Sequence, residues 1–211
     1  ETLQFQVYFT TTASNVGFTY WSHDIGGFMS KESTDPEIFA RWVQWGALSP
    51  IFRTHAWRQN YLERRIWKYK YFSEMREALY LRYSLIPYIY TTARNTYDTG
   101  IGMLYPLYYN YPDVYNAYTY FNQAMFGDDI LLAPVTSSML NATNYSEIDL
   151  YVPESNIWIE WFSLTALAPG EYKRKIQIDE IPIYIKSGSI IPMFFVNPIS
   201  SLMNLENNYN E

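Results

Sequence analysis

The first 60 residues alternate between stripes of apolar residues at helical spacing and short runs rich in aromatic residues. Within residues 2–14, Phe5, Phe9 and Ala13 recur at every fourth position, which predicts a short helix with one apolar face. Residues 15–17 follow this stripe and are expected to end the helix, because their glycine can adopt the left-handed backbone conformation common at helix C-termini.

Two β-prone runs flank a second predicted helix. Residues 18–21 (FTYW) and 50–57 (PIFRTHAW) are typical of strands, and two glycines follow the first run where a loop begins. Between the runs, residues 35–37 (DPE) give an N-cap acid, a proline at the first helical position and a carboxylate at the positive helix end. The order strand, loop, helix, strand is a βαβ unit, so the two strands are expected to lie parallel and adjacent.

Polar side chains stand where these two strands end. Asp24 follows the first strand, and Arg53 and His55 lie at the end of the second. Functional side chains of βαβ units collect at the carboxyl ends of the strands, so we expect the three residues to converge. An acid, a guanidinium and an imidazole at one barrel mouth would form a polar clamp for a hydroxylated ligand.

The second half of the chain changes from helical to β-prone character. Residues 73–98 predict one long helix that Pro87 kinks and Gly100 closes. Beyond about residue 130, short β-prone runs separated by turn residues predict a small antiparallel β-sandwich. These runs are residues 130–135, 148–153, 156–162, 175–178, 181–186 and 189–195.

The composition limits the possible classes of protein. The 211 residues include no cysteine, are 48% hydrophobic and carry a formal charge of −6, which indicates a globular chain. Nucleic-acid binding is disfavoured because the one basic cluster is Glu63-Arg64-Arg65, for which a structural or solvated role is the default. The chain has no apolar run long enough for a membrane span. Aromatic residues make up 19% and could provide flat faces for sugar rings.

Six motifs follow one another in order between about Phe5 and Met193: YFTTTASNVGFTYWSHDIGGFM, DPEIFARWVQWGALSPIFRTH, ERRIWKY, MREALYLRYSLIPYIYTTAR, MFGDDILLAPV and IPIYIKSGSIIPM. With these motifs the chain resembles glycoside hydrolase family 31, the family of α-glucosidases, α-xylosidases and their relatives. The resemblance implies the last part of a (β/α)8 barrel, here residues 1–112, then the proximal C-terminal β-sandwich, residues 113–197. Residues 198–211 are Asn-rich and polar, as expected of a tail or linker.

The resemblance also implies an activity and a set of site residues. The family hydrolyses α-linked glucosides or xylosides from non-reducing ends with two aspartates, a nucleophile and an acid/base. Neither catalytic motif occurs here, so the chain resembles the second half of an enzyme and needs the remainder of its barrel. His55 matches a histidine that hydrogen-bonds the sugar, Asp24 an acid lining the same pocket, and Phe28 its aromatic wall. Arg53 matches an arginine that holds the pocket carboxylates in place. No cofactor or metal is implied.

Each site residue also has a structural interpretation. Trp21 and Trp57 are further candidate sugar platforms, but Trp21 taken alone would be a core residue. His55 taken alone would be a hydrogen-bonded structural histidine, and Asp24 with Arg53 a structural ion pair. The role of His23 stays open.

Two further hypotheses stand beside the hydrolase. The chain could be a non-catalytic carbohydrate-binding module that uses its aromatic surface, or a degenerate structural relative with exposed strand edges. Gly127-Asp128-Asp129 resembles the metal-binding turn of polymerases but lacks the further acids of such a site, and in the family it is a turn before a strand. Asn141 and Asn144 each begin a glycosylation sequon.

Overall fold

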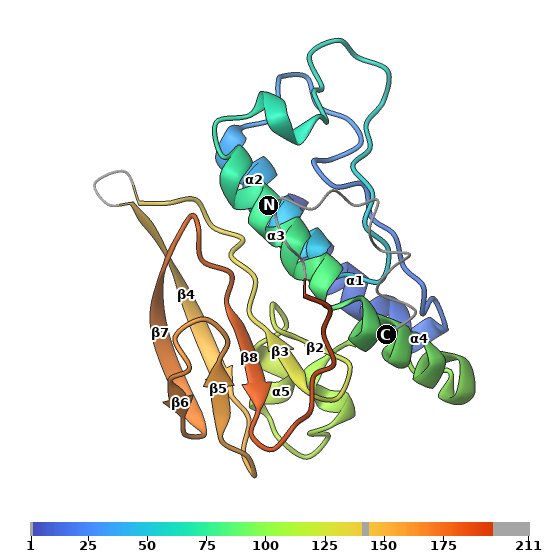
Figure 1. The fold of residues 1–211 in the computed structure, drawn as a ribbon, viewed down its shortest axis with the longest axis vertical. Coiled ribbons are helices and arrows are strands. Elements are labelled where there is room, and N and C mark those ends of the chain that lie inside the picture. The colour runs from blue at the N-terminus through green and yellow to red at the C-terminus, as the bar shows by residue number, and fades with distance from the viewer. Residues whose placement is uncertain (1, 141–143, 196–211) are drawn as a thin grey trace.

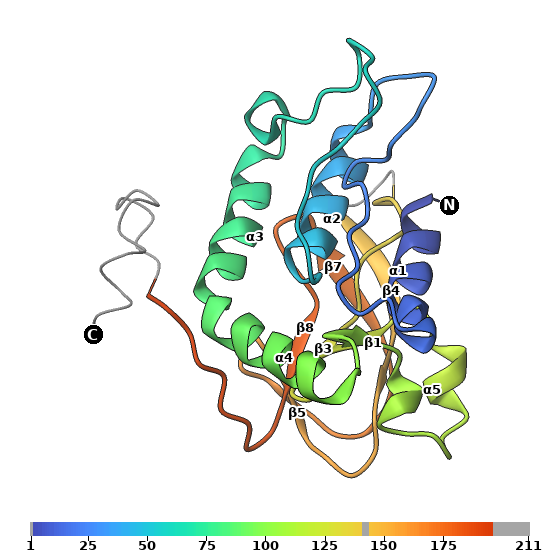
Figure 2. The same cartoon turned by 90° about the vertical axis from the view of Figure 1, so that its right-hand side faces the viewer.

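A computed structural model describes residues 2–140 and 144–195. A layer of helices packs against a set of antiparallel strands, with the helices on one side of the molecule and the strands on the other (Figures 1 and 2). The polar segment 198–211 and the sequon at Asn141 lie outside the described residues. Among the described residues, no helix combines the length and apolar character needed to cross a bilayer.

Helix α2, Pro36–Ala47, forms where the sequence predicts it. Asp35 caps its N-terminus, and its Oδ1 accepts hydrogen bonds from the backbone N–H groups of Glu37 at 2.9 Å and Ile38 at 3.0 Å. These two donors would otherwise be unpaired, which explains why the helix begins at this aspartate. All residues of α2 from Phe39 to Ala47 are buried.

Helix α1, Thr2–Thr12, and the 3₁₀ turn η1, Ala13–Val16, correct the predicted apolar face. Gly17 ends this segment with a φ of 82°, as expected. The buried face, however, consists of Leu3, Val7, Thr10 and Thr11, whereas the predicted residues Phe5 and Phe9 are 54% and 40% exposed. The sequence offers two apolar stripes on this helix, and spacing alone does not tell which one faces the core.

The predicted long helix over residues 73–98 is two helices. Helix α3, Phe72–Ser84, and helix α4, Ile86–Thr99, are separated at Leu85. Pro87 cannot donate a backbone hydrogen bond and occupies the first turn of α4, so it starts a helix here and does not kink one. Gly100 closes α4 in the left-handed conformation, as predicted.

The strands predicted over residues 18–21 and 50–57 do not form. The two segments meet only in an isolated parallel bridge between Ile25, which lies beyond the first run, and Thr54 of the second. The parallel direction is therefore right, whereas the position of the first strand and the length of both are wrong. The Phe18 N–H instead donates to the carbonyl of Ala13, the first residue of η1, at 3.1 Å. No other strand of the described residues flanks the bridge, so nothing there extends the ladder.

The predicted antiparallel β-sandwich is confirmed. The larger sheet has the strand order β1-β2-β3-β8-β5-β6, and β4 pairs with β7 in the smaller one, all antiparallel. The strands are β1 Leu104–Tyr105, β2 Ala124–Phe126, β3 Ile130–Leu132, β4 Tyr145–Val152, β5 Trp158–Glu160, β6 Ala166–Leu167, β7 Gly170–Gln177 and β8 Ile183–Lys186. Short elements complete the fold: η2 Ile66–Lys68, η3 Leu107–Tyr109 and α5 Asn116–Thr119.

Several details of the β region differ from the sequence prediction. Residues 189–195 form no strand, and Ile190 and Phe195 are nearly fully exposed, because Pro192 interrupts the run and no strand of the described part lies beside it. The short strands β1, β2 and β6 were not predicted. Residues 127–129 are a turn between β2 and β3, as the family resemblance implies. The division at residue 112 stays a prediction; β1 pairs across it with β2.

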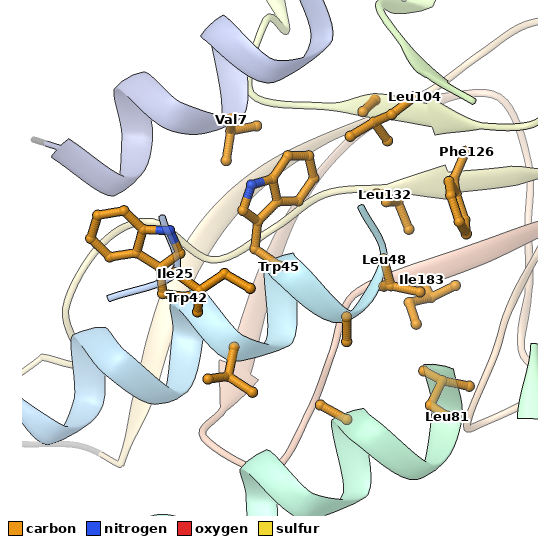
Figure 3. Close-up of a cluster of buried hydrophobic side chains, with 14 of the residues drawn as sticks. Val7, Ile25, Trp42, Trp45, Leu48, Leu81, Leu104, Phe126, Leu132 and Ile183 are labelled. Atoms are coloured by element: carbon orange, nitrogen blue, oxygen red, sulfur yellow. The ribbon is translucent and has the colours of Figure 1, made fainter. Parts of the chain in front are cut away.

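Two hydrophobic clusters hold the layers together. The first lies between the helices and the larger sheet, where Trp45 reaches from α2 toward Val7 of α1 and Leu104 of β1 (Figure 3). The second lies among the strands and includes the fully buried Trp158 and Tyr184. Burial of apolar side chains on this scale is the main stabilising contribution to such a fold.

Candidate functional site

The parallel bridge places the predicted polar residues on one face. The Ile25 N–H donates to the carbonyl of Arg53 at 3.1 Å, and the His55 N–H donates to the carbonyl of Ile25 at 3.4 Å. Ile25 is fully buried, so it marks the core-facing side. Side chains alternate along extended backbone, so Asp24, Arg53 and His55 are directed away from that side. The predicted convergence therefore follows from this short pairing.

Asp24 and Arg53 form an ion pair across the bridge. Their side chains are 26% and 51% exposed, respectively, so solvent screens the attraction. A pair of this exposure contributes about 0–1 kcal/mol to stability. Its main consequence is local: the guanidinium fixes where the Asp24 carboxylate points.

Phe28 and His55 lie ring against ring. The ring centroids are 5.5 Å apart and the planes are inclined by 20°. Trp57 meets Phe28 edge-on at 5.8 Å and donates its backbone N–H to the Phe28 carbonyl at 2.7 Å. Phe28 and Trp57 are exposed while His55 is half-buried, so the group presents a flat apolar wall beside an imidazole edge.

Trp21 belongs to a different aromatic group. Its ring meets Phe9 edge-on at 5.0 Å and Phe18 at 6.2 Å. The Trp21 ring nitrogen is buried and has no hydrogen-bond partner among the described residues. The structure thus groups Asp24, Phe28, Arg53 and His55, and shows no contact of Trp21 with them; a role of Trp21 as a sugar platform stays a prediction.

His23 is a buried, neutral histidine. It is 4% exposed, neither ring nitrogen has a partner among the described residues, and its ring lies 6.3 Å from that of Trp45. Burial lowers the pKa of His23 from 6.5 to about 4, although the neighbouring Asp24 opposes the shift. The imidazole is therefore uncharged near neutral pH.

Arg64 is the site residue that the sequence reasoning missed. Its guanidinium reaches the loops that carry Asp24, Phe28 and His55, and it is half-buried. The charged triplet Glu63-Arg64-Arg65 drew attention in the sequence but was assigned a structural or solvated role. The signal that could have singled out Arg64 is its place shortly after the second strand, within reach of both strand ends.

The described residues bring together no three acidic or histidine side chains that could hold a metal ion. A cavity of about 360 Å³ adjoins the same loop, with Gly26, Gly27 and Trp42 in its lining, but its lining includes none of the four grouped side chains. The group Asp24, Phe28, Arg53 and His55 is therefore arranged on an accessible surface beside this cavity.

Comparison with known proteins shows the family to which the chain belongs. The family model described as "Glycosyl hydrolases family 31 TIM-barrel domain" matches residues 1–92, and the family 31 C-terminal domain matches residues 100–191. The chain is therefore the last part of a (β/α)8 barrel followed by an antiparallel β domain. It belongs to glycoside hydrolase family 31.

Relatives and solved structures give the same assignment. A 1,6-alpha-glucosyltransferase of Sporosarcina globispora is 36% identical over 84% of this chain and 14% of its own length. An alpha-xylosidase of Saccharolobus solfataricus is 32% identical over 93% of this chain and 26% of its own length. The structure of a Flavobacterium johnsoniae GH31 dextranase complexed with glucose superposes with a TM-score of 0.83 at 27% identity, covering 92% of this chain and 24% of that chain. The chain thus spans about a quarter or less of these relatives.

Proposed function

We propose that this chain is part of a retaining glycosidase that cleaves α-linked glucosides or xylosides from the non-reducing ends of oligosaccharides. The observation that carries the proposal is the grouping of Asp24, Arg53, Phe28 and His55 beside one parallel bridge. Membership of family 31 supports it, as do relatives whose names are alpha-glucosidase and alpha-xylosidase.

In this proposal the four residues bind and orient one sugar ring. The Asp24 carboxylate, held by Arg53, accepts hydrogen bonds from sugar hydroxyls. The imidazole of His55 provides a further polar contact, and Phe28 lies against the C–H face of the ring. Trp21 would contribute an additional platform beyond this group.

The bond-breaking carboxylates come from outside these residues. A retaining glycosidase needs a nucleophile and an acid/base about 5–5.5 Å apart on either side of the scissile bond. The motifs that carry them in family 31 are absent from this sequence, so we assign Asp24 to binding and not to attack. The proposed reaction needs no cofactor.

We infer that the remainder of the barrel covers the exposed aromatic side of α1. Phe5 and Phe9 are stacked 5.2 Å apart on this side, and Phe18 is 63% exposed. Contiguous exposed apolar side chains of this kind mark surfaces that pack against other protein.

The test is to express the full-length protein and follow hydrolysis of an aryl α-glucoside and an aryl α-xyloside. His55→Ala is compared with the parent, and Tyr90→Ala serves as the control because Tyr90 is 79% exposed on α4. We expect the parent to release one of the sugars, His55→Ala to lose most of that activity, and Tyr90→Ala to keep it.

A folded parent that hydrolyses neither substrate contradicts the proposal. Sugar binding by such a protein, measured by calorimetry, would favour the carbohydrate-binding module, and absence of binding would favour the structural relative. Full activity of His55→Ala would show that His55 does not belong to the proposed pocket.

A further inference from the structure

Arg64 connects the two loops of the proposed site through one guanidinium. Its Nε–H donates to the carbonyl of His55 at 3.0 Å, and Nη2 donates to the carbonyls of Gly26 at 2.8 Å and Gly27 at 2.5 Å. Nη1 donates to the hydroxyl of Thr34 at 3.0 Å, next to the cap of α2. Arginine has five N–H donors in a rigid plane, and no other side chain could reach acceptors on three segments in this way.

A compact turn presents Arg64 to these acceptors. Glu63 folds back so that its Oε1 accepts the backbone N–H groups of Arg64 and Arg65, each at 2.9 Å. The Arg65 guanidinium closes the turn from the solvent side, with Nε 2.8 Å from Oε1 and Nη2 2.6 Å from Oε2 of Glu63. The carbonyl of Glu63 accepts from Arg64 Nη1 at 2.6 Å and from the Tyr69 hydroxyl at 2.8 Å. Arg64 thus binds backbone carbonyls of the two loops, whereas the adjacent Arg65 pairs with Glu63.

Gly26 provides the space that Arg64 occupies. A Cβ on Gly26 would lie 2.7 Å from Nε and 2.8 Å from Cζ of Arg64, and 2.8 Å from the ring of Phe39. The guanidinium carbon also lies 5.6 Å from the centre of the Phe39 ring, in cation–π contact. The first glycine of the Ile-Gly-Gly sequence is therefore explained by its left-handed backbone conformation, with φ at 96°, together with the close approach of Arg64 and Phe39.

We propose that Arg64 is a positioning residue that sets the Asp24–Phe28 loop and His55 at a fixed separation. The role rests on the proposed function, because the two loops carry the residues assigned to sugar binding. Arg64 touches no assigned sugar-binding side chain by a hydrogen bond; it holds the backbone on which those side chains stand. Small displacements of binding groups lower the rate of the chemical step strongly, since catalysis depends on orientation.

Arg64→Lys in the full-length protein tests the role, with Arg65→Lys as the matched control. Lysine keeps the charge at either position, but a single ammonium cannot span the three segments. We expect Arg64→Lys to lower kcat/KM by about 10- to 100-fold, mostly in kcat. Arg65→Lys should stay within about twofold, because lysine can retain the exposed pair with Glu63. All rates are measured well below the melting temperature of each variant.

Rescue separates positioning from general loss of folding. Arg64→Ala leaves a gap at the guanidinium, so guanidinium ion at sub-denaturing concentration should restore part of the lost kcat, whereas urea at equal concentration should not. A folded Arg64→Lys variant with the kcat of Arg65→Lys overturns the inference while the proposed function stands, and absence of rescue in folded Arg64→Ala also counts against it. A parent that cleaves neither aryl glycoside overturns the proposed function, and the positioning role with it.

Discussion

The ring of Phe28 is stacked on the ring of His55, with 5.5 Å between centroids and 20° between planes. The two residues come from different segments of the predicted βαβ unit. The bridge between Ile25 and Thr54 and the guanidinium of Arg64 hold those segments together. An apolar wall and an imidazole are thereby held in a fixed relation, which suits a ligand with a C–H face and a hydroxyl edge.

Replacing Phe28 by alanine should weaken substrate binding more than it weakens the fold. The ring is 37% exposed, so its loss removes little core packing, and the free energy of unfolding should fall by about 1 kcal/mol or less. The value of KM for the cleaved aryl glycoside should rise by about tenfold, because a face-to-face contact with the sugar is lost. Steady-state kinetics and urea unfolding give the two quantities.

Phe162→Ala is the control for Phe28→Ala, since Phe162 is also exposed, at 59%, but belongs to the β region. It should leave KM unchanged. Equal KM values for parent and Phe28→Ala would show that Phe28 does not form the wall of the pocket.

The sequence predicted the elements whose local signals and tertiary environment agree. Asp35 and Pro36 start α2 because capping is a local interaction, and Gly100 ends α4 for the same reason. The run 18–21 has high β-propensity but becomes irregular, because strand formation needs a neighbour that propensity does not supply. The exposed Phe5 and Phe9 show the same limit for a helix face.

The candidate site was predictable where it depends on strand order. Asp24, Arg53 and His55 could be grouped because side chains at the ends of parallel neighbours share one edge. The contacts of Arg64 could not be predicted, because its acceptors are mostly backbone carbonyls, which are the same in every sequence; only its place shortly after the run 50–57 pointed to it. Trp21 shows the converse: it precedes Asp24 by only three residues, yet it packs on Phe9 and Phe18.

The buried His23 should make stability depend on pH between about 6.5 and 4. Burial lowers its pKa to about 4 in the folded chain. As pH falls through 6.5, this histidine therefore becomes protonated in the unfolded chain but stays neutral in the folded chain. Stability is therefore lost as pH falls across this window, by up to about 3 kcal/mol, and the loss is complete below about pH 4. Urea unfolding of the parent and of His23→Leu at pH 7 and pH 4 measures the difference.

His23→Leu should lose less stability than the parent on acidification, by about the same 3 kcal/mol. Tyr90→Ala, which removes an exposed side chain on α4, is the control and should keep the parental loss. Equal losses of stability in His23→Leu and the parent between pH 7 and pH 4 would show that His23 does not cause the pH dependence.

Gly26→Ala should destabilise the protein by roughly 3 kcal/mol, combining backbone strain with overlap against Arg64 and the ring of Phe39. Gly100→Ala is the matched comparison: φ is +76° there and +96° at Gly26, but a Cβ on Gly100 meets nothing within 4 Å. Gly100→Ala should therefore lower the free energy of unfolding only by the backbone strain, about 1–2 kcal/mol. In an Arg64→Ala background the destabilisation caused by Gly26→Ala should become smaller, because the overlap with the guanidinium is gone, but the overlap with Phe39 keeps it above that of Gly100→Ala. Equal losses of unfolding free energy for Gly26→Ala and Gly100→Ala would contradict the close contact of Arg64 with Gly26.

Arg41 on α2 joins the helical layer to the β region. It is 3% exposed, and its Nη2 donates to the carbonyls of Ile176 at 3.3 Å and Gln177 at 2.9 Å, while Nη1 donates to that of Glu180 at 3.1 Å. Burial lowers the pKa of Arg41 to about 10, so the side chain stays charged near neutral pH. These carbonyls lie at the end of β7 and in the turn that follows it, so one side chain of α2 binds the point where β7 gives way to that turn.

Arg41→Met should lower the free energy of unfolding by about 3 kcal/mol, because it removes the hydrogen bonds of a buried guanidinium to the carbonyls of Ile176, Gln177 and Glu180. Arg76→Met on the exposed side of α3 should change stability by no more than about 0.5 kcal/mol. The unfolding of the two layers should also become less coupled. In urea, the fluorescence of Trp45 in the helical layer and that of Trp158 in the β region should then change at different urea concentrations. Single-tryptophan variants report each separately. Coincident transitions at the parental midpoint would show instead that apolar packing between α2 and the sheet alone couples the two layers.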